Sequence, residues 1–364
     1  MTHLSGWDTL ADDALMAELN LVARLSSFFH AYLLWWLLAA YVLAAMAPGF
    51  GLLIRYRSLG ELTLFQETLS LSFPFIMLAV LLFNAGLGMQ TARLQSLRKR
   101  KLPLLVGLMA NCLVPLAFIA LTSPLMKLWH DPVEVQDLIL GLALVAAMPI
   151  AGSSTAWSQV VNGDLALSLG LVLSTTLLSP VTTPAVLYAV SLLATGQYAE
   201  ALQGLAAGGT GAFLWVGVVV PSLLGILARL AVGEARIASV RPQIKLLTVL
   251  ILLLLNYSNA SLSLPQVMDE PDLDFLLVTL ALAFTLCLAT FVSAFWLGRL
   301  LEVDAAQEAS LMYGLGMNNN GTGLVLASVS LAAYPQVMLP IIFYNLVQHV
   351  VAGIVQFFKY RKED

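Results

Sequence analysis

Two runs of small and polar residues stand inside long apolar stretches of the chain, and their side chains could bind a cation or a polar organic molecule. The first polar run, residues 149–158, reads PIAGSSTAWS, and the second polar run, residues 314–323, reads GLGMNNNGTG. The first run offers a cluster of hydroxyl oxygens, and the second offers three consecutive carboxamides flanked by glycines. Such oxygens suit Na⁺, and hydroxyls and amides also hydrogen-bond to polar organic substrates.

Polar runs of this kind favour helices that are interrupted inside the membrane. In hydrocarbon an unpaired backbone N–H or C=O costs several kcal/mol, so an interruption survives only where protein or an aqueous cavity satisfies the freed groups. The amino end of a half-helix presents N–H groups to an anion, and the carboxyl end presents carbonyls to a cation. We therefore predict that both runs are helix breaks that touch at mid-membrane and form a pocket.

The composition places the chain among integral membrane proteins. Of its 364 residues, 60% are hydrophobic and only 10% are charged, against about 25% charged in globular domains. Cys112 and Cys287 both lie in apolar runs, which argues against a disulfide framework. Nothing in the sequence supports nucleic-acid binding.

The elements that must position the two polar runs are membrane-spanning helices of about 20 apolar residues each. The ten predicted spans are residues 31–54, 72–92, 103–126, 137–162, 164–191, 211–231, 243–263, 275–298, 305–333 and 336–358. The polar runs fall in the fourth and ninth spans. Between the first two spans, residues 58–71 are expected to form a short surface helix.

Five spans before and five after a connector predict an inverted repeat, because an odd number of spans turns the second copy upside down. The expected fold is all-α, with two inverted five-helix repeats whose discontinuous fourth and ninth helices cross at mid-membrane. The predicted parts are an amphipathic cytoplasmic segment (1–30), the first repeat (31–191), a connector (192–210), the second repeat (211–358) and a cytoplasmic tail (359–364).

The distribution of basic residues predicts the orientation in the membrane. If the amino terminus is cytoplasmic, every Lys and Arg lies in a cytoplasmic loop or tail except Arg55, Arg57 and Lys127. Basic residues concentrate on the cytoplasmic side of membrane proteins. We therefore expect a multi-pass protein of the inner (plasma) membrane with both termini in the cytoplasm.

Single polar residues in other spans are further candidates for the pocket. His349 lies near the middle of the tenth span beside Gln348, and Asn111 lies in the third span. Ionisable residues at such a depth often mark ion or substrate paths. For His349, a structural hydrogen bond to a broken helix and a proton-carrying role both remain open.

These residues resemble the bile acid:sodium symporter family, in which two broken helices cross at the centre of ten spans. The family's first crossing helix carries a Pro-Gly-Gly-Thr-x-Ser-Asn run, a Gly-Asp turn and a Ser-rich span that ends in Ser-Pro. Here PIAGSST (149–155), GDLALS (163–168) and STTLLSP (174–180) stand at matching spacing. The family's second crossing helix reads Glu-x-Gly-Met-Gln-Asn-x-Gly, against GLGMNNNG (314–321) here, and a His in span ten corresponds to His349.

The resemblance extends over residues 31–358 and implies a core bundle that rocks against a panel of helices. By resemblance, the sodium ligands are Asn111, Ser154, Thr155, Ser168 and Asn318, with backbone carbonyls of Gly314, Leu315 and Met317. By resemblance, the substrate contacts are Gly152, Ser153, Asn319, Asn320 and His349.

Two departures from the family pattern concern the ion. The family's glutamate in the second crossing helix is Gly314 here, and its asparagine in the first is Thr155. A missing buried carboxylate removes the largest local contribution favouring a cation. Weaker sodium binding, the loss of one site and a switch to proton coupling all remain open.

The resulting hypothesis is a secondary transporter that moves a small organic anion, bile-acid-like, keto-acid-like or pantoate-like, by alternating access with sodium coupling. The alternative is a sodium-independent or proton-linked carrier on the same fold, and a more distant one is a membrane sensor or enzyme. An enzyme would need a nucleophile, base or metal cluster at the membrane face, and the sequence suggests none. We therefore expect no enzyme activity and no cofactor, with sodium as coupling ion and the substrate and lipid bilayer as partners.

Overall fold

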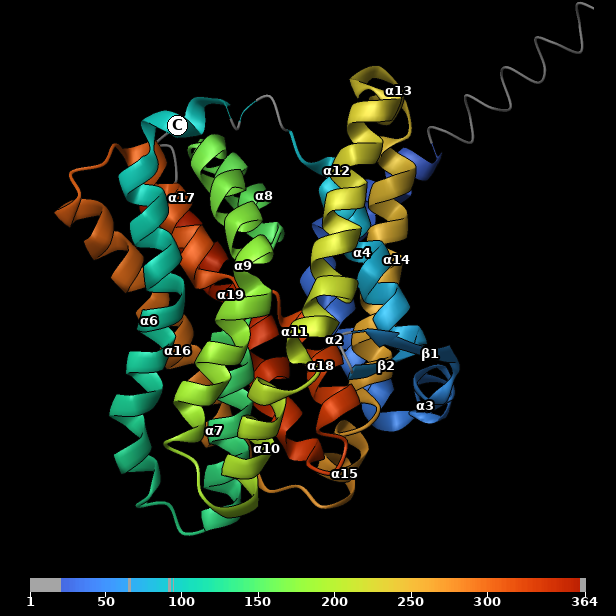
Figure 1. The fold of residues 1–364 in the computed structure, drawn as a ribbon, viewed down its shortest axis with the longest axis vertical. Helices are drawn as coiled ribbons and strands as arrows, with labels where there is room; N and C mark the ends of the chain where they lie inside the picture. The colour runs from blue at the N-terminus through green and yellow to red at the C-terminus, as the bar shows by residue number, and fades with distance from the viewer. Residues whose placement is uncertain (1–20, 65–66, 91–92, 94, 361–364) are drawn as a thin grey trace, which may run out of the picture.

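The structure is a computed structural model that describes residues 21–64, 67–90, 93 and 95–360. Over these residues the chain is mostly helical (Figure 1). Six helical segments are long and apolar enough to cross a membrane. They are α6 (Lys101–Met126), α9 (Leu165–Ser191), the segment Thr210–Val232 that comprises α11, η2 and α12, α14 (Arg241–Ala260), α16 (Leu273–Leu300), and the segment Pro335–Lys359 that contains α19 (Met338–Lys359).

The other four predicted spans hold shorter helices. These are α2 (Leu33–Met46) with α3 (Gly49–Tyr56), α4 (Phe73–Gly88), α7 (Pro132–Ala147) with α8 (Ser153–Val160), and α17 (Ala305–Gly316) with α18 (Asn320–Ser330). Each predicted span is thus occupied by helix, although a count of ten crossings does not follow from length and apolarity alone. A helix over Leu21–Ala31 precedes α2 and meets it at a bend of 76°. Most of the predicted amino-terminal segment, residues 1–20, lies outside the described residues.

The prediction of a surface helix over residues 58–71 is wrong, because this stretch forms an antiparallel hairpin. Strands β1 (Ser58–Leu64) and β2 (Glu67–Ser72) pair with Leu62 opposite Leu69. Exposed Thr68 and Ser70 alternate with buried Leu69. This alternation has the two-residue period of a strand with one buried face. Burial of that face favours a strand over a helix here.

The helices form two groups that stand side by side in Figure 1. The small helix group consists of α2, α3, α4, α12 (Val220–Val232) and α14, in which α4 packs against α12 and α14 against α2 and α3. The large helix group consists of α6, α7, α8, α9, α16, α17 and α19. Helix α18 lies between them, since it contacts α4 and α14 on one side and α7 and α19 on the other.

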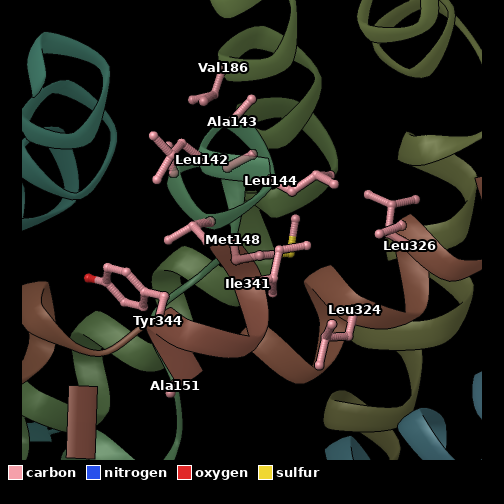
Figure 2. Packing of buried hydrophobic residues seen from close by; sticks show 14 of the residues in the cluster. Leu142, Ala143, Leu144, Met148, Ala151, Val186, Leu324, Leu326, Ile341 and Tyr344 are labelled. Atoms are coloured by element: carbon pink, nitrogen blue, oxygen red, sulfur yellow. The ribbon is translucent and has the colours of Figure 1, made fainter. Parts of the chain in front are cut away.

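Helix α7 is buried at every position from Asp137 to Ala147, which makes it the centre of the large helix group. Figure 2 shows its side chains Leu142 and Leu144 in the same apolar core as Ile341 of α19 and Leu324 of α18. Neighbouring helices therefore cover α7 on every side up to its carboxyl end, and this is where the first polar run begins.

Candidate functional site

Both polar runs contain helix breaks, and the two breaks lie against each other as predicted. The first break, residues 148–152, separates α7 from α8, and the second break, residues 317–319, separates α17 from α18. The N–H of Ala151 donates to the carbonyl of Met317, and the N–H of Asn319 donates to the carbonyl of Pro149, each over 2.8 Å. The breaks thus form a short antiparallel bridge and satisfy part of each other's backbone.

Local sequence explains why the helices stop here. Pro149 has no N–H and disfavours helical angles in the residue before it, and Met148 is accordingly extended, with φ −79° and ψ 146°. Met317 is extended as well, with φ −127° and ψ 107°. Asn319 then begins α18 as its N-cap, because its side-chain oxygen accepts a bond from the N–H of Thr322 at 3.3 Å.

Side chains of neighbouring helices satisfy further backbone groups of the first break. Thr175 Oγ1 of α9 accepts from the N–H of Ile150 at 3.2 Å, and Thr183 Oγ1 donates to the carbonyl of Ala147 at 2.6 Å. Asn318 Nδ2 donates to the carbonyl of Val145 at 2.9 Å. Neither threonine was predicted from the sequence, and their spacing of eight residues on one helix face was the available signal.

The predicted sodium ligands are mostly buried. The exposed fractions of Ser154, Ser168 and Asn318 are 0%, 1% and 1%. Ser168 Oγ donates to Thr155 Oγ1 at 3.0 Å, which joins α9 to α8. Within the described residues, the side-chain oxygens Oγ of Ser154 and Oδ1 of Asn318 have no hydrogen-bond partner, and the same holds for Oδ1 of buried Asn111 on α6. Free oxygens buried in this way are what a cation without a water shell needs.

The backbone part of the predicted ligand set lies in buried surroundings that are apolar. Gly314, Leu315 and Met317 are all buried. A Cβ added at Gly314 would lie 3.2 Å from Leu171 Cδ1 and 3.8 Å from Ile150 Cδ1. Among the described residues no group of three or more His, Cys, Asp or Glu could hold a metal ion. Any cation bound here would therefore depend on neutral oxygens.

The predicted substrate contacts lie on a more open side of the two breaks. Gly152 is exposed, and an added Cβ there would meet nothing within 4 Å. Ser153 and Asn319 are half-buried, while Asn320 is buried. The helix breaks thus have an open side at Gly152, Ser153 and Asn319 and a closed side at the buried hydroxyls.

Gln348, rather than His349, joins α19 to the second break. Gln348 Oε1 accepts from the N–H of Asn318 and from Asn320 Nδ2, both at 3.0 Å. His349 is half-buried and makes no hydrogen bond to the described part of the chain; it interacts electrostatically with His30. From the sequence, Gln348 was identified only as a neighbour of His349, because hydropathy does not tell which of two adjacent side chains faces inward.

A chain of buried polar side chains continues from Gln348 to the small helix group. Gln348 Nε2 donates to Asn345 Oδ1 at 3.3 Å, and Asn345 Nδ2 donates to Tyr41 Oη at 2.8 Å and to Asn256 Oδ1 at 3.1 Å. Tyr41 Oη donates to Asn256 Oδ1 at 2.8 Å. The position of the second break is thereby linked to α2 and α14.

Comparison with known proteins bears on the class of molecule that has this site. The family model described as "Sodium Bile acid symporter family" matches residues 75–270, which include the first break. Over 271 residues the chain is 28% identical to "Uncharacterized protein YbaS" of Bacillus subtilis (strain 168), covering 73% of this chain and 83% of that relative. Over 279 residues it is 22% identical to "Uncharacterized sodium-dependent transporter YocS" of the same organism, covering 76% and 80%.

Proposed function

The chain belongs to the sodium bile acid symporter family, and from that membership we propose that it is a secondary transporter that carries a small organic anion across the membrane by alternating access. The substrate class is a bile-acid-like, keto-acid-like or pantoate-like carboxylate. The observation that carries the proposal is the hydrogen-bonded pair of helix breaks, with Ala151 and Met317 joined at 2.8 Å. Paired breaks of this kind are the usual place of the central site in secondary transporters.

In this proposal the anion binds on the open side of the breaks. Gly152 leaves free space, and the amide of Asn319 and the hydroxyl of Ser153 are half-buried and reachable. Helices α8 and α18 both begin on the open side, so the partial positive charge at their amino ends favours an anion. Two further residues complete the proposed substrate contacts: Asn320, which is buried behind the open side, and His349 of α19.

Sodium is the proposed coupling ion and would bind on the closed side. The unpartnered oxygens of Ser154, Asn318 and Asn111 support this, together with Thr155, Ser168 and the backbone carbonyls of Gly314, Leu315 and Met317. An ion that binds one access state more tightly than the other shifts the two populations by that difference in affinity. The relative named as a sodium-dependent transporter is consistent with such coupling.

Gly314 favours a second candidate, a sodium-independent or proton-linked carrier on the same fold. A carboxylate at this position would be the strongest attraction for a cation, and Leu171 and Ile150 border the place where it would stand. Neutral oxygens alone bind Na⁺ less tightly. The two candidates differ only in the coupling ion.

The arrangement in the membrane that we propose has ten spans in two inverted repeats, 31–191 and 211–358, joined by residues 192–210. The small and large helix groups would be the panel and the core bundle. Both termini would face the cytoplasm, and the protein would lie in the inner (plasma) membrane.

Uptake into proteoliposomes tests the function. Labelled cholate, pantoate and pyruvate are each offered with an inward Na⁺ gradient, with K⁺ in its place, or with a pH gradient. We expect uptake of at least one anion to depend on Na⁺ and to fall at least tenfold in Asn319→Leu. The matched control Thr285→Ala, on an exposed face of α16, should transport as the parent does. Uptake driven by pH alone favours the second candidate, and no uptake of any anion under any gradient contradicts the proposed substrate class.

A further inference from the structure

The two helix groups are bridged on one side of the helix breaks. With the orientation proposed above, the inner end of the molecule carries α13 (Glu234–Ser239), at the top of Figure 1, and the outer end carries α10 (Gly196–Ala207) and α15 (Leu264–Asp269). Helix α18 is the outer half of the second broken span, and it contacts helices of both groups. The bridge between the groups therefore lies on the outer side of the breaks.

The two halves of the first broken span also differ in how well they are covered. The outer half, α7, is buried at every position from Asp137 to Ala147, so protein covers this approach to the first break. The inner half, α8, packs against α9 and α17 but leaves Gly152, Ala156 and Val160 exposed. Because residues four apart lie on one face of a helix, these three form an exposed strip that runs from the first break toward the inner end.

Two hydrogen bonds between buried side chains join the groups directly on the outer side. Asn345 of α19 donates through Nδ2 to Tyr41 Oη of α2 at 2.8 Å and to Asn256 Oδ1 of α14 at 3.1 Å. We call these three residues the buried triad; their exposed fractions are 7%, 5% and 1%. Asn256 lies near the last residue of α14, Ala260, and Asn345 lies near the first residue of α19, Met338. Both of these helix ends are at the outer end.

A further contact ties the small helix group to the bridging helix. The guanidinium of Arg55 on α3 donates to the carbonyl of buried Ser328, close to the last residue of α18, Ser330. Since α18 runs outward from the second break, this bond also lies on the outer side. The hydrogen bonds of Asn345 and of Arg55 thus act on the same side of the molecule.

Separation of the two groups at the outer end would break these bonds. A buried donor or acceptor that loses its partner costs free energy, and a fully satisfied polar network favours the one arrangement that satisfies it. Secondary transporters change access largely by rocking one bundle of helices against the other. The bonds of Asn345 therefore oppose a movement of this kind that opens the outer side.

The buried triad is connected to the second break through Gln348. Gln348 Nε2 donates to Asn345 Oδ1 at 3.3 Å, while Gln348 Oε1 accepts from Asn318 and Asn320. Asn318 and Asn320 are the residues proposed to contact the sodium ion and the anion. A ligand that displaces either of them therefore acts on the triad through one intervening side chain.

We propose that the buried triad is a latch that holds the outer side closed, so that this structure is the access state open to the inner side. The bonds of Asn345 to Tyr41 and Asn256 must then break before the anion site can face outward. The proposal rests on the proposed function for the existence of two access states. Removal of the latch should shift the population toward the outward-open state, because it destabilises only the arrangement in which these bonds are made.

Labelling with a membrane-impermeant maleimide tests the latch without any transported ligand. The probe is Gly152→Cys, at the start of the exposed strip, and the label is added to right-side-out or to inside-out membrane vesicles in K⁺ buffer. Labelling of the native Cys112 and Cys287 is measured in the chain without the probe and subtracted. We expect the chain with the probe alone to react at least fivefold faster from the inner side than from the outer side.

Three substitutions, each combined with the probe, separate the latch from a general loss of stability. Asn345→Leu removes both bonds between the groups and should lower the ratio of inner to outer labelling at least tenfold. Tyr41→Phe removes only one of the bonds and should lower the ratio about threefold. Asn84→Leu is the matched control, because Asn84 Nδ2 donates to Thr248 Oγ1 at 3.1 Å within the small helix group. It should change the ratio less than twofold.

Each outcome decides one part of the proposal. Equal labelling from the two sides in the chain with the probe alone, or faster labelling from the outer side, overturns the assigned access state. An unchanged ratio in Asn345→Leu, or in Tyr41→Phe and Asn256→Leu if Asn345→Leu does not fold, overturns the latch.

Uptake of cholate, pantoate and pyruvate by the parent in the same vesicles keeps this result separate from the proposed function. Uptake together with an unchanged labelling ratio contradicts the latch alone. A shifted ratio without uptake of any of the three anions contradicts the proposed function alone, since labelling needs neither anion nor sodium.

Discussion

The backbone N–H of Asn319 lies 2.8 Å from the carbonyl oxygen of Pro149, and this bond joins the break in α17–α18 to the break in α7–α8. The two residues come from opposite halves of the chain. Each break supplies hydrogen-bond partners for backbone groups of the other. A substitution in one break should therefore alter the stability of both.

Replacing Asn318 by Leu should destabilise the protein. The carboxamide satisfies the carbonyl of Val145 in the last turn of α7, at 2.9 Å, and a buried polar group left without a partner costs about 1–3 kcal/mol. The melting temperature in detergent should fall clearly below that of the parent. Thr182→Ala, at a half-buried position of α9, serves as control; an equal loss in both variants would contradict the role of Asn318.

Gln348 and His349 should respond differently to the same substitution. Gln348→Leu removes the acceptor for the N–H of Asn318 and breaks the link to Asn345, so both stability and anion uptake should fall. His349→Leu removes no hydrogen bond to the described residues, so stability should change little while uptake reports its proposed substrate role. Melting temperature and uptake rate of the two variants decide the matter; equal destabilisation would show that His349 also supports the fold.

A carboxylate side chain at position 314 would need space that neighbouring side chains now occupy. A Glu there begins 3.2 Å from Leu171 Cδ1, so Gly314→Glu alone should be poorly stable, because overpacking a tight core typically costs about 1–3 kcal/mol. The double variant with Leu171→Ala should regain stability and bind Na⁺ more tightly than the parent. Sodium titrations of the melting temperature measure this, with Leu171→Ala alone as control. Unchanged sodium affinity in a folded double variant would contradict the mapped ion site.

We expect the stability of the protein to depend on pH through Glu134, which lies on the side of the membrane that we assign to the outside. Burial raises the pKa of the Glu134 carboxyl; the hydrogen bond from Trp129 Nε1 at 2.6 Å lowers it in part, and Asp272 and Asp131 raise it further. When the pKa of a carboxyl is raised in the folded state, the stability of the protein falls as the pH rises from the ordinary pKa of 4.5 through the raised pKa.

Glu134→Gln should therefore melt at a higher temperature than the parent at pH 8, with a difference that shrinks toward pH 4. The glutamine oxygen can still accept from Trp129, so the substitution mainly removes the charge. Melting curves between pH 4 and pH 8 check this, with Glu61→Gln at an exposed strand position as control. A difference that is constant with pH would refute the prediction.

The amino-acid sequence by itself determined where most helices form and where two of them are interrupted. Long apolar stretches define the helices, and Pro149 and the Asn-Gly segment around Asn319 interrupt two of them, because these effects act within a few residues. The helix expected over residues 58–71 was wrong, because the apolar and polar residues of this stretch alternate with the period of a strand and form a hairpin.

Only the tertiary structure decided which groups meet. That Gln348 rather than His349 contacts the second break, and that Thr175 and Thr183 hydrogen-bond to the first, depends on how helices are rotated and packed against one another. Hydropathy is nearly the same for any rotation of a helix that is apolar on all sides, such as α7. Rotation is fixed instead by contacts between distant segments, and those contacts exist only in the folded chain.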